Sequence, residues 1–405
     1  MMRNLRRVVA LATASGFFVG LVVARAPPPV AAATVSAPVV STSESPSWAL
    51  DAPDPDVVRD GDSYYAFTTG TTWGNHIGVL KSSSPVSGWN TVNGKSYGSS
   101  ALPAPPGWQT TNTQTSPGVV SLGGRWVMYY DATVRATGKY CLSVATSSSP
   151  AQPFSDTTSG PWHCDDAFGG AIDPSPFVDA DGRAWLYWKT NDGSDPQPAR
   201  IWAAPLSADG LAFAATPAVV FTQDTVATPW ETTVEDPDMI KVGGTYVLIF
   251  SANRWNSASY VQSDATCASP VGPCTQSTLP FLASYGSVAG PGGGTAFEAA
   301  DGSWYLAYQG WTQGCTDYAC GGARRLFVAP VQFGVLPTCT SHAEAAYVIA
   351  AADGSTTAFS NDGGACGRGL GVVPSFPVVG IASTPSTSGY WLVATDGGIF
   401  SFGDA

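Results

Sequence analysis

The chain has 405 residues, a formal net charge of −12 and charged residues at only 12% of its length. An acidic surface repels nucleic acid and anionic membranes, so these are excluded as expected partners. The 45 glycines and 32 prolines, combined with so few charges, are typical of short strands joined by many turns. We therefore expect an all-β protein with little helix.

Residues 1–33 have the pattern of a secretory signal peptide. Three arginines precede an apolar stretch from Val8 to about Val23, and small residues follow it. A membrane anchor is the alternative, but the stretch is shorter than the ~20 apolar residues that span a bilayer. We expect cleavage and export, with a flexible leader rich in Ser, Thr, Ala and Pro over residues 34–47.

A pattern recurs five times between residues 48 and 335, at steps of 54 to 63 residues. Each copy has a small or acidic residue next to a proline, a short strand, a turn that contains glycine, and an aromatic-rich strand. A strand repeat of this length predicts a radial or solenoid architecture. The prolines that mark the five copies are Pro55, Pro117, Pro174, Pro237 and Pro291.

The repeat predicts that carboxylates far apart in the chain lie together. In a β-propeller, blades of four antiparallel strands surround a central channel, and the start of each innermost strand lies at one mouth of it. Three blades would supply carboxylates there and two would not. Neighbouring like charges raise at least one pKa, and hydrolysis of a glycosidic bond needs one protonated acid and one ionised base. The residues expected at this mouth are Asp54, Ser116, Asp173, the Glu235-Asp236 pair and Gly290.

These acidic motifs resemble those of glycoside hydrolase family 43, and the resemblance covers residues 50–335. The motifs are Asp54-Pro55-Asp56-Val57, Ile172-Asp173-Pro174-Ser175 and Val234-Glu235-Asp236-Pro237. The resemblance implies a five-bladed β-propeller that hydrolyses arabinose- or xylose-containing polysaccharides with inversion, and arabinan is the first substrate to test. It also implies Asp54 as general base, Glu235 as general acid, and Asp173 as the carboxylate that raises the pKa of the acid and orients it.

Other residues are expected to bind sugar or to stabilise the fold. Sugar rings stack on aromatic faces, and an arginine can reach a hydroxyl or a carboxylate. The candidates are Trp73, Trp108, Trp255 and Arg324 or its neighbour Arg325; blade packing is the alternative for each tryptophan, and a surface position for the arginines. Structural or solvated roles are expected for Asp51, Asp56, Asp236 and Asp238.

No cofactor is expected. The family often has a histidine in the glycine motif of the fifth blade, where it helps to hold a central ion, but residues 292–295 contain none. A calcium ion in the channel is thus compatible with the resemblance without support from the residues. The Asp-x-Asp-Gly run at 179–182 resembles part of a calcium loop, but the other copies have a turn there.

The eight cysteines of an exported chain indicate disulfides rather than a metal site, because no Cys-x-x-Cys is present. Cysteines that are neighbours in the sequence are expected to pair. The expected pairs are Cys141 with Cys164, Cys267 with Cys274, Cys315 with Cys320, and Cys339 with Cys366.

A second, shorter repeat occupies residues 340–405. The segment that begins at Tyr347 is echoed 43 residues later by the one that begins at Tyr390. It resembles the Gly-Tyr-Trp-Leu-Val-Ala-x-Asp-Gly-Gly repeats of actinobacterial exported proteins, and we expect a partial β-repeat module. For the whole chain we expect a secreted monomer that acts on a polysaccharide or oligosaccharide. A non-catalytic carbohydrate-binding propeller is the alternative function.

Overall fold

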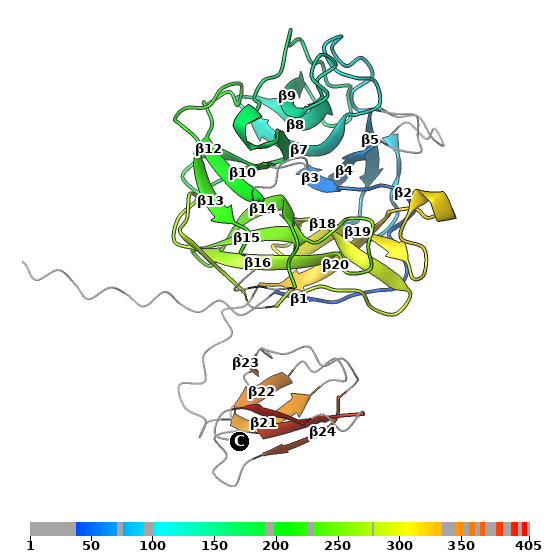
Figure 1. Ribbon diagram of the computed structural model, residues 1–405, viewed down its shortest axis with the longest axis vertical. Coiled ribbons are helices and arrows are strands. Elements are labelled where there is room, and N and C mark those ends of the chain that lie inside the picture. Colours follow the sequence, from blue (N-terminus) through cyan, green and yellow to red (C-terminus); the bar gives the residue numbers. More distant parts are fainter. Residues whose placement is uncertain are drawn as a thin grey trace, which may run out of the picture. The chain divides into compact units, whose positions relative to one another are not determined.

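The computed structural model is built almost entirely of strands, and five small antiparallel sheets form a ring (Figure 1). This arrangement confirms the five-bladed β-propeller. The residues that the structure describes are 38–70, 76–92, 100–190, 198–224, 228, 230–277, 279–333, 345–350, 356–360, 365–368, 378–383, 390–395 and 399–402.

Each blade is formed by consecutive strands, with the first strand innermost. Blade 1 contains β3 (Asp56–Asp60), β4 (Ser63–Thr69), β5 (Ile77–Ser82) and β6 (Asn90–Thr91). Blade 2 contains β7 (Thr115–Leu122), β8 (Arg125–Thr133) and β9 (Tyr140–Ser147). Blade 3 contains β10 (Ala171–Val178), β11 (Ala184–Thr190), β12 (Arg200–Pro205) and β13 (Ala218–Thr222). Blade 4 contains β14 (Val234–Val242), β15 (Thr245–Ala252), β16 (Val261–Cys267) and β17 (Cys274–Gln276).

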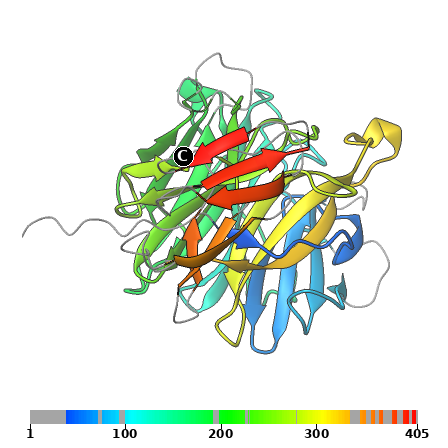
Figure 2. The same ribbon diagram turned by 90° about the horizontal axis from the view of Figure 1, so that it is seen from below.

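The fifth blade is completed by the N-terminal part of the chain. Its own strands are β18 (Val288–Glu298), β19 (Trp304–Thr312) and β20 (Arg325–Gln332). On the outer side of β20 lie β1 (Val39–Val40) and β2 (Trp48–Asp51). The first blade and the fifth lie side by side, blue and yellow in Figures 1 and 2. Pairing of chain ends this far apart closes the ring, and it includes two residues of the expected leader.

Aromatic and aliphatic side chains fill the five interfaces between neighbouring blades. Between blades 1 and 2, for example, Phe67, Val119 and Tyr130 are buried together, and between blades 4 and 5 Ile249 packs with Tyr308. The second strand of each blade supplies such side chains because it is buried on both faces. The interior of the molecule is therefore a set of blade interfaces arranged around the channel.

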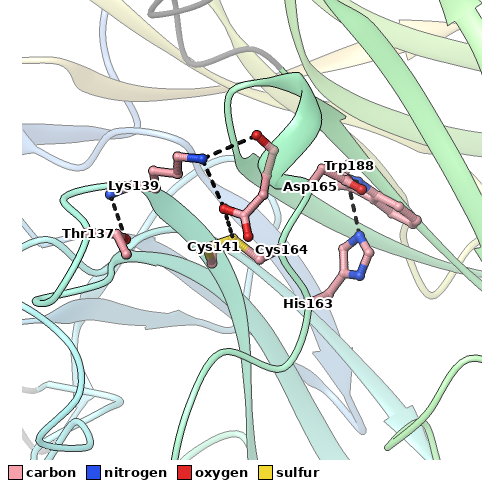
Figure 3. Close-up of a disulfide and its surroundings, with 8 residues drawn as sticks. Thr137, Lys139, Cys141, His163, Cys164, Asp165 and Trp188 are labelled. Carbon is pink, nitrogen blue, oxygen red and sulfur yellow. Dashed lines mark hydrogen bonds and ion pairs between the residues drawn. A yellow bond between two sulfur atoms is a disulfide. The ribbon is translucent and has the colours of Figure 1, made fainter.

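Three of the four expected disulfides are present. Cys141 bonds to Cys164, Cys267 to Cys274 and Cys315 to Cys320. The fourth pair, Cys339 with Cys366, lies outside the described side chains. The Cys141–Cys164 bond ties β9 to the segment before the 3₁₀ turn Asp166–Phe168, close to His163, Asp165 and Trp188 (Figure 3).

The C-terminal part forms two three-stranded sheets. One contains β21 (Ala345–Ala350), β22 (Thr356–Ser360) and β23 (Ala365–Arg368), and the other contains β24 (Val378–Ser383), β25 (Tyr390–Ala394) and β26 (Ile399–Phe402). Within the described parts of the chain, no helix has the length and apolar character that crossing a membrane requires.

Candidate active site

Five equivalent residues, one from each blade, line a single small cavity of about 30 Å³. We call this set the cavity row. Every member has a left-handed backbone, with φ between 46° and 59°. Outside glycine this conformation is costly, and short polar side chains such as Asp tolerate it best. The backbone therefore restricts the row to small or acidic residues, which are Asp54, Ser116, Asp173, Asp236 and Gly293.

Two positions further along each blade lies a second set of equivalent residues, which we call the closure row. Its members join neighbouring blades. The Asp56 carboxylate accepts the backbone N–H of Val119 at 2.7 Å, and the hydroxyl of Thr295 donates to the carbonyl of Pro55 at 2.9 Å. The closure row is Asp56, Gly118, Ser175, Asp238 and Thr295.

The strand register corrects one sequence expectation. Gly290 was expected at the channel, but the residue there is Gly293, because Thr295 pairs with Ala307 as Asp56 pairs with Phe67. Two irregularities in β18, between Ala289 and Thr295, shift the register. Gly290 instead packs closely against the backbone of blade 4, where an added Cβ would lie 2.3 Å from the carbonyl oxygen of Ser257.

Asp54 is held by donors from two blades. The hydroxyl of Thr69, at the end of β4, donates to Oδ2 of Asp54 at 2.6 Å. Arg324 Nη1 donates to Oδ1 at 2.9 Å, and both side chains are almost buried. The backbone N–H of Asp54 donates to Gln309 Oε1 at 2.8 Å. Both carboxylate oxygens are thus fixed, and the Asp54 side chain lines the cavity.

Glu235 stands one residue before the cavity row and forms an ion pair with Lys189. The Lys189 Nζ lies 3.0 Å from Glu235 Oε2, and the two side chains are 5% and 12% exposed. Burial alone would lower the pKa of Lys189, but the charges of Glu235 and Asp173 outweigh it and raise that pKa. A buried cation therefore accompanies the carboxyl expected to act as acid.

Asp173 lies among other carboxyls. Its backbone N–H donates to Asp131 Oδ1 at 3.1 Å, and its own Oδ2 accepts the backbone N–H of Asp236 at 3.2 Å. Burial raises the pKa of Asp173 to about 6; the Lys189 charge opposes this rise, and the charges of Glu235 and Asp54 add to it. The charges of Glu235 and Asp54 both act on Asp173, and Asp54 and Asp173 line one cavity. The structure therefore brings the three predicted catalytic carboxyls together.

Asp236, for which a structural or solvated role is expected from the sequence, lines the channel cavity. It is a member of the cavity row, beside Asp54 and Asp173. The hydroxyl of Tyr260 donates to its Oδ2 at 2.6 Å. Burial, followed by the charge of Asp173, raises the pKa of Asp236 well above its ordinary value.

The other acids expected to be structural have bonds within the scaffold. Asp56 and Asp238 belong to the closure row, and Asp238 accepts the backbone N–H of Ala296 at 2.7 Å. Asp51 accepts the backbone N–H of Arg324 at 2.7 Å. Asp51 thus positions the arginine that holds Asp54.

Two of the predicted sugar-binding residues lie together at the site. Trp255 is 37% exposed, and the Arg324 guanidinium lies 4.7 Å from its ring centre. Trp311 stacks beside Trp255 with ring centres 6.1 Å apart, and Tyr318 accepts a hydrogen bond from Arg324 Nε at 3.0 Å. The result is a partly exposed aromatic face joined through Arg324 to Asp54.

The other two predicted sugar-binding residues have no described link to the carboxyls. The indole of Trp108 donates to the Thr158 hydroxyl at 3.0 Å, within blade 2. Trp73 lies outside the described residues.

The sequence analysis did not single out Lys189, which pairs with Glu235. It also did not single out the polar side chains that bond to the cavity residues, which are Thr69, Gln309 and Tyr260. The sequence contains a signal for Lys189, because this charged residue directly follows the uncharged, aromatic-rich run Trp185-Leu186-Tyr187-Trp188. A charge in a buried strand needs a partner. Of the expected Glu235-Asp236 pair, the Asp-Pro alignment points to Asp236 as the cavity-row member, because it precedes Pro237 as Asp54 precedes Pro55 and Asp173 precedes Pro174.

No group of three or more His, Cys, Asp or Glu side chains suited to hold a metal ion is found among the described residues. A larger hollow of about 710 Å³ lies on the outer part of blade 2, bordered by Thr146, Trp162 and Leu211. No carboxylate lines it, so it lacks the acid and base for hydrolysis. The carboxyls predicted from the sequence at Asp54 and Asp173 line the smaller channel cavity instead.

Comparisons with known proteins agree with this geometry. The family model described as "Glycosyl hydrolases family 43" matches residues 43–334. A β-D-galactofuranosidase of Aspergillus niger is 29% identical over 169 residues, which are 41% of this chain and 45% of the relative. The match thus spans less than half of that relative.

Two solved structures share the fold. A thermostable family-43 glycoside hydrolase has a TM-score of 0.57 at 22% identity, with 81% of this chain and 96% of that one covered. An endo-arabinase of Bacteroides thetaiotaomicron has a TM-score of 0.59 at 18% identity, with coverage of 71% and 97%.

Proposed function

Because the chain belongs to glycosyl hydrolases family 43, we propose that it is a secreted, inverting glycoside hydrolase that cleaves α-L-arabinofuranosyl or β-D-xylosyl linkages of plant cell-wall polysaccharide. The observation that carries this proposal is the unequal cavity row. In blades 1, 3 and 4 the row presents Asp54, Asp173 and Asp236, with Glu235 directly before Asp236, whereas blades 2 and 5 present Ser116 and Gly293. A scaffold without catalysis has no need of several buried carboxyls in one cavity.

In the proposed reaction, Asp54 acts as the base. It accepts a proton from a water molecule as the water oxygen bonds to the anomeric carbon, and the bond to the leaving oxygen breaks. Glu235 supplies the proton that the leaving oxygen takes up. Attack from the face opposite the leaving group inverts the anomeric centre, and inversion requires about 6.5–9.5 Å between the two carboxyls.

The cations beside these carboxyls suit the two roles. Arg324 and Thr69 hold Asp54 with both oxygens fixed, which orients the base toward its water. Lys189 lies beside Glu235, so the carboxylate that remains after proton donation has a counter-charge in place. Asp173, within electrostatic reach of both, acts as the third carboxyl that holds the acid in its working state.

The substrate class follows from family membership and from the names of relatives. Those names include an endo-arabinase, an α-L-arabinofuranosidase and a β-D-galactofuranosidase. We take arabinofuranosyl linkages first and β-D-xylosyl linkages second, with Trp255 as the surface for stacking of a sugar ring. The assay panel also includes a galactofuranoside.

The test is an activity profile of the purified protein on aryl α-L-arabinofuranoside, β-D-xyloside and β-D-galactofuranoside, and on arabinan, arabinoxylan and xylan. Asp54→Asn and Glu235→Gln are each expected to lower kcat/KM by about 10²–10⁴-fold, as loss of a general base or acid does. The matched controls are Asp60→Asn and Glu298→Gln, two exposed carboxyls on hairpins, which should leave kcat/KM unchanged.

The alternative function is a non-catalytic carbohydrate-binding propeller. It would be favoured by a wild-type protein that binds polysaccharide and hydrolyses none of the substrates in the panel. Export has its own test, because N-terminal sequencing of the mature protein from the culture medium should begin after residue 33 if the expected signal peptide is removed.

A further inference from the structure

The carboxyls of the site fall into two classes by their partners. Asp54 has Arg324 at 2.9 Å, and Glu235 has Lys189 at 3.0 Å. Within the described parts of the chain, Asp173 and Asp236 form no ion pair with a lysine or arginine. The site therefore holds two carboxyls with a cation and two without.

The two carboxyls without a cation are neighbours. Asp173 and Asp236 occupy the same position on blades 3 and 4 and line the same cavity. The backbone N–H of Asp236 donates to Asp173 Oδ2 at 3.2 Å, so the Asp173 carboxylate lies against the backbone from which the Asp236 side chain projects.

The charged and titratable groups around this pair are mostly acidic. Asp236 lies near the charges of Asp54, Asp173 and Glu235, and Tyr260 donates to it. Asp173 lies near Asp54, Asp131, Glu235 and Lys189. The charge of Lys189 acts on Asp173, but Lys189 already has Glu235 at 3.0 Å, and Arg324 is paired with Asp54 at 2.9 Å. Like charges in such a place raise the pKa of at least one of the two carboxyls.

We propose that Asp173 and Asp236 share one proton in the resting site, which makes Asp236 a positioning residue for the protonation state of the hydrolytic carboxyls. The shared proton keeps one member of the pair neutral over the working pH range. It thereby limits the negative charge near Glu235, and it makes the titration of Asp173 a property of the pair. The raised pKa values of both carboxyls agree with this assignment.

The shared proton is a property of the free protein, so the titration of the two carboxyls can be measured by NMR without a substrate. In protein labelled with ¹³C at the aspartate carboxyl carbons, the signals of Asp173 and Asp236 are assigned by comparison with Asp173→Asn and Asp236→Asn and followed from pH 3 to 9. In Asp236→Asn, the remaining Asp173 signal should titrate lower by about one pH unit or more, because a like charge has been removed.

The reciprocal measurement provides a second observation on a different variant. In Asp173→Asn, the Asp236 signal should move down in the same way, since the coupling of two sites is mutual. Asp238→Asn is the matched control, a buried carboxyl in the same strand whose bonds are to Ala296 and Ser175. It should leave both signals in place.

If the Asp173 titration stays within about 0.2 pH units in Asp236→Asn, and that of Asp236 does so in Asp173→Asn, the proposal is wrong. Should one variant fail to fold, the other still decides. A pH profile of kcat/KM for Asp236→Asn adds a functional reading: a limb of the profile should be displaced, because the protonation of the site no longer depends on a coupled pair. Loss of activity without a displaced limb would indicate a merely structural Asp236.

Discussion

The cavity row and the closure row follow the same five-fold geometry and differ in what their side chains contact. Polar side chains of the closure row form hydrogen bonds to neighbouring blades: Asp238 accepts the Ala296 N–H, and Thr295 donates to the Pro55 carbonyl. In the cavity row, Asp54, Asp173 and Asp236 line a shared cavity, which Ser175 and Thr295 of the closure row also border. Residues two positions apart in one blade thus differ in the contacts of their side chains, and each row can be perturbed separately.

The largest effect is expected at the buried cation beside the acid. Lys189→Met leaves Glu235 without its partner and should lower the free energy of unfolding at pH 7 by about 3–5 kcal/mol, the typical cost of breaking a buried ion pair. Lys139→Met is the control, because its pair with Asp166 is exposed and should contribute less than about 1 kcal/mol. Equal losses in chemical denaturation would refute the importance of the Lys189–Glu235 pair.

A methyl group in the closure row should also be costly. In Gly118→Ala the new Cβ would lie 2.2 Å from the Pro174 carbonyl oxygen and 2.6 Å from Pro176 Cδ, so blades 2 and 3 must separate. We expect the free energy of unfolding to fall by about 3 kcal/mol. Gly107→Ala, where nothing lies within 4 Å, should change it far less; similar values for the two variants would contradict the close approach.

In the cavity row, removal of a carboxyl should stabilise the fold. The pKa of Asp173 is raised from 3.8 to about 6, so the folded state loses stability as the pH rises from about 4 to about 6 and remains lower above that range. Asp173→Asn should therefore raise the free energy of unfolding at pH 7 by about 2 kcal/mol and change it little at pH 4. Thermal unfolding at both pH values measures this difference, and a variant no more stable at pH 7 than the wild type would oppose it.

The smallest effect is expected at Ser116, an uncharged member of the same row. Ser116→Ala should change the free energy of unfolding by no more than about 0.5 kcal/mol and leave kcat/KM unchanged, since no role in proton transfer falls to blade 2. A loss of activity comparable to that of Asp54→Asn would show that the row acts through more than its carboxyls.

Much of this division could be predicted from sequence, because the Asp-Pro pairs carry both the strand start and the acid. These pairs indicate Asp54 and Asp173. A separate signal, the closeness of the cysteines in the sequence, predicts the three disulfides that are present. The fifth blade was placed three residues away, at Gly290 instead of Gly293. A glycine run has no side chains to indicate register, and β18 contains two irregularities.

Contacts across the ring were harder to predict. The pairing of β1 and β2 with β20 joins segments nearly 300 residues apart, and nothing local in either segment indicates it. The ion pair of Lys189 with Glu235 crosses from blade 3 to blade 4. The repeat locates the blades, but the partners of each carboxyl depend on how neighbouring blades pack.

In the proposed function, two carboxyls held on different blades hydrolyse a glycosidic bond in a single displacement. The most direct test follows hydrolysis of the best substrate in the panel by proton NMR and records the anomer that forms first. We expect a product of inverted configuration, with Asp54 activating the water. A first product of retained configuration would contradict it, because Asp54 would then have to act as a nucleophile.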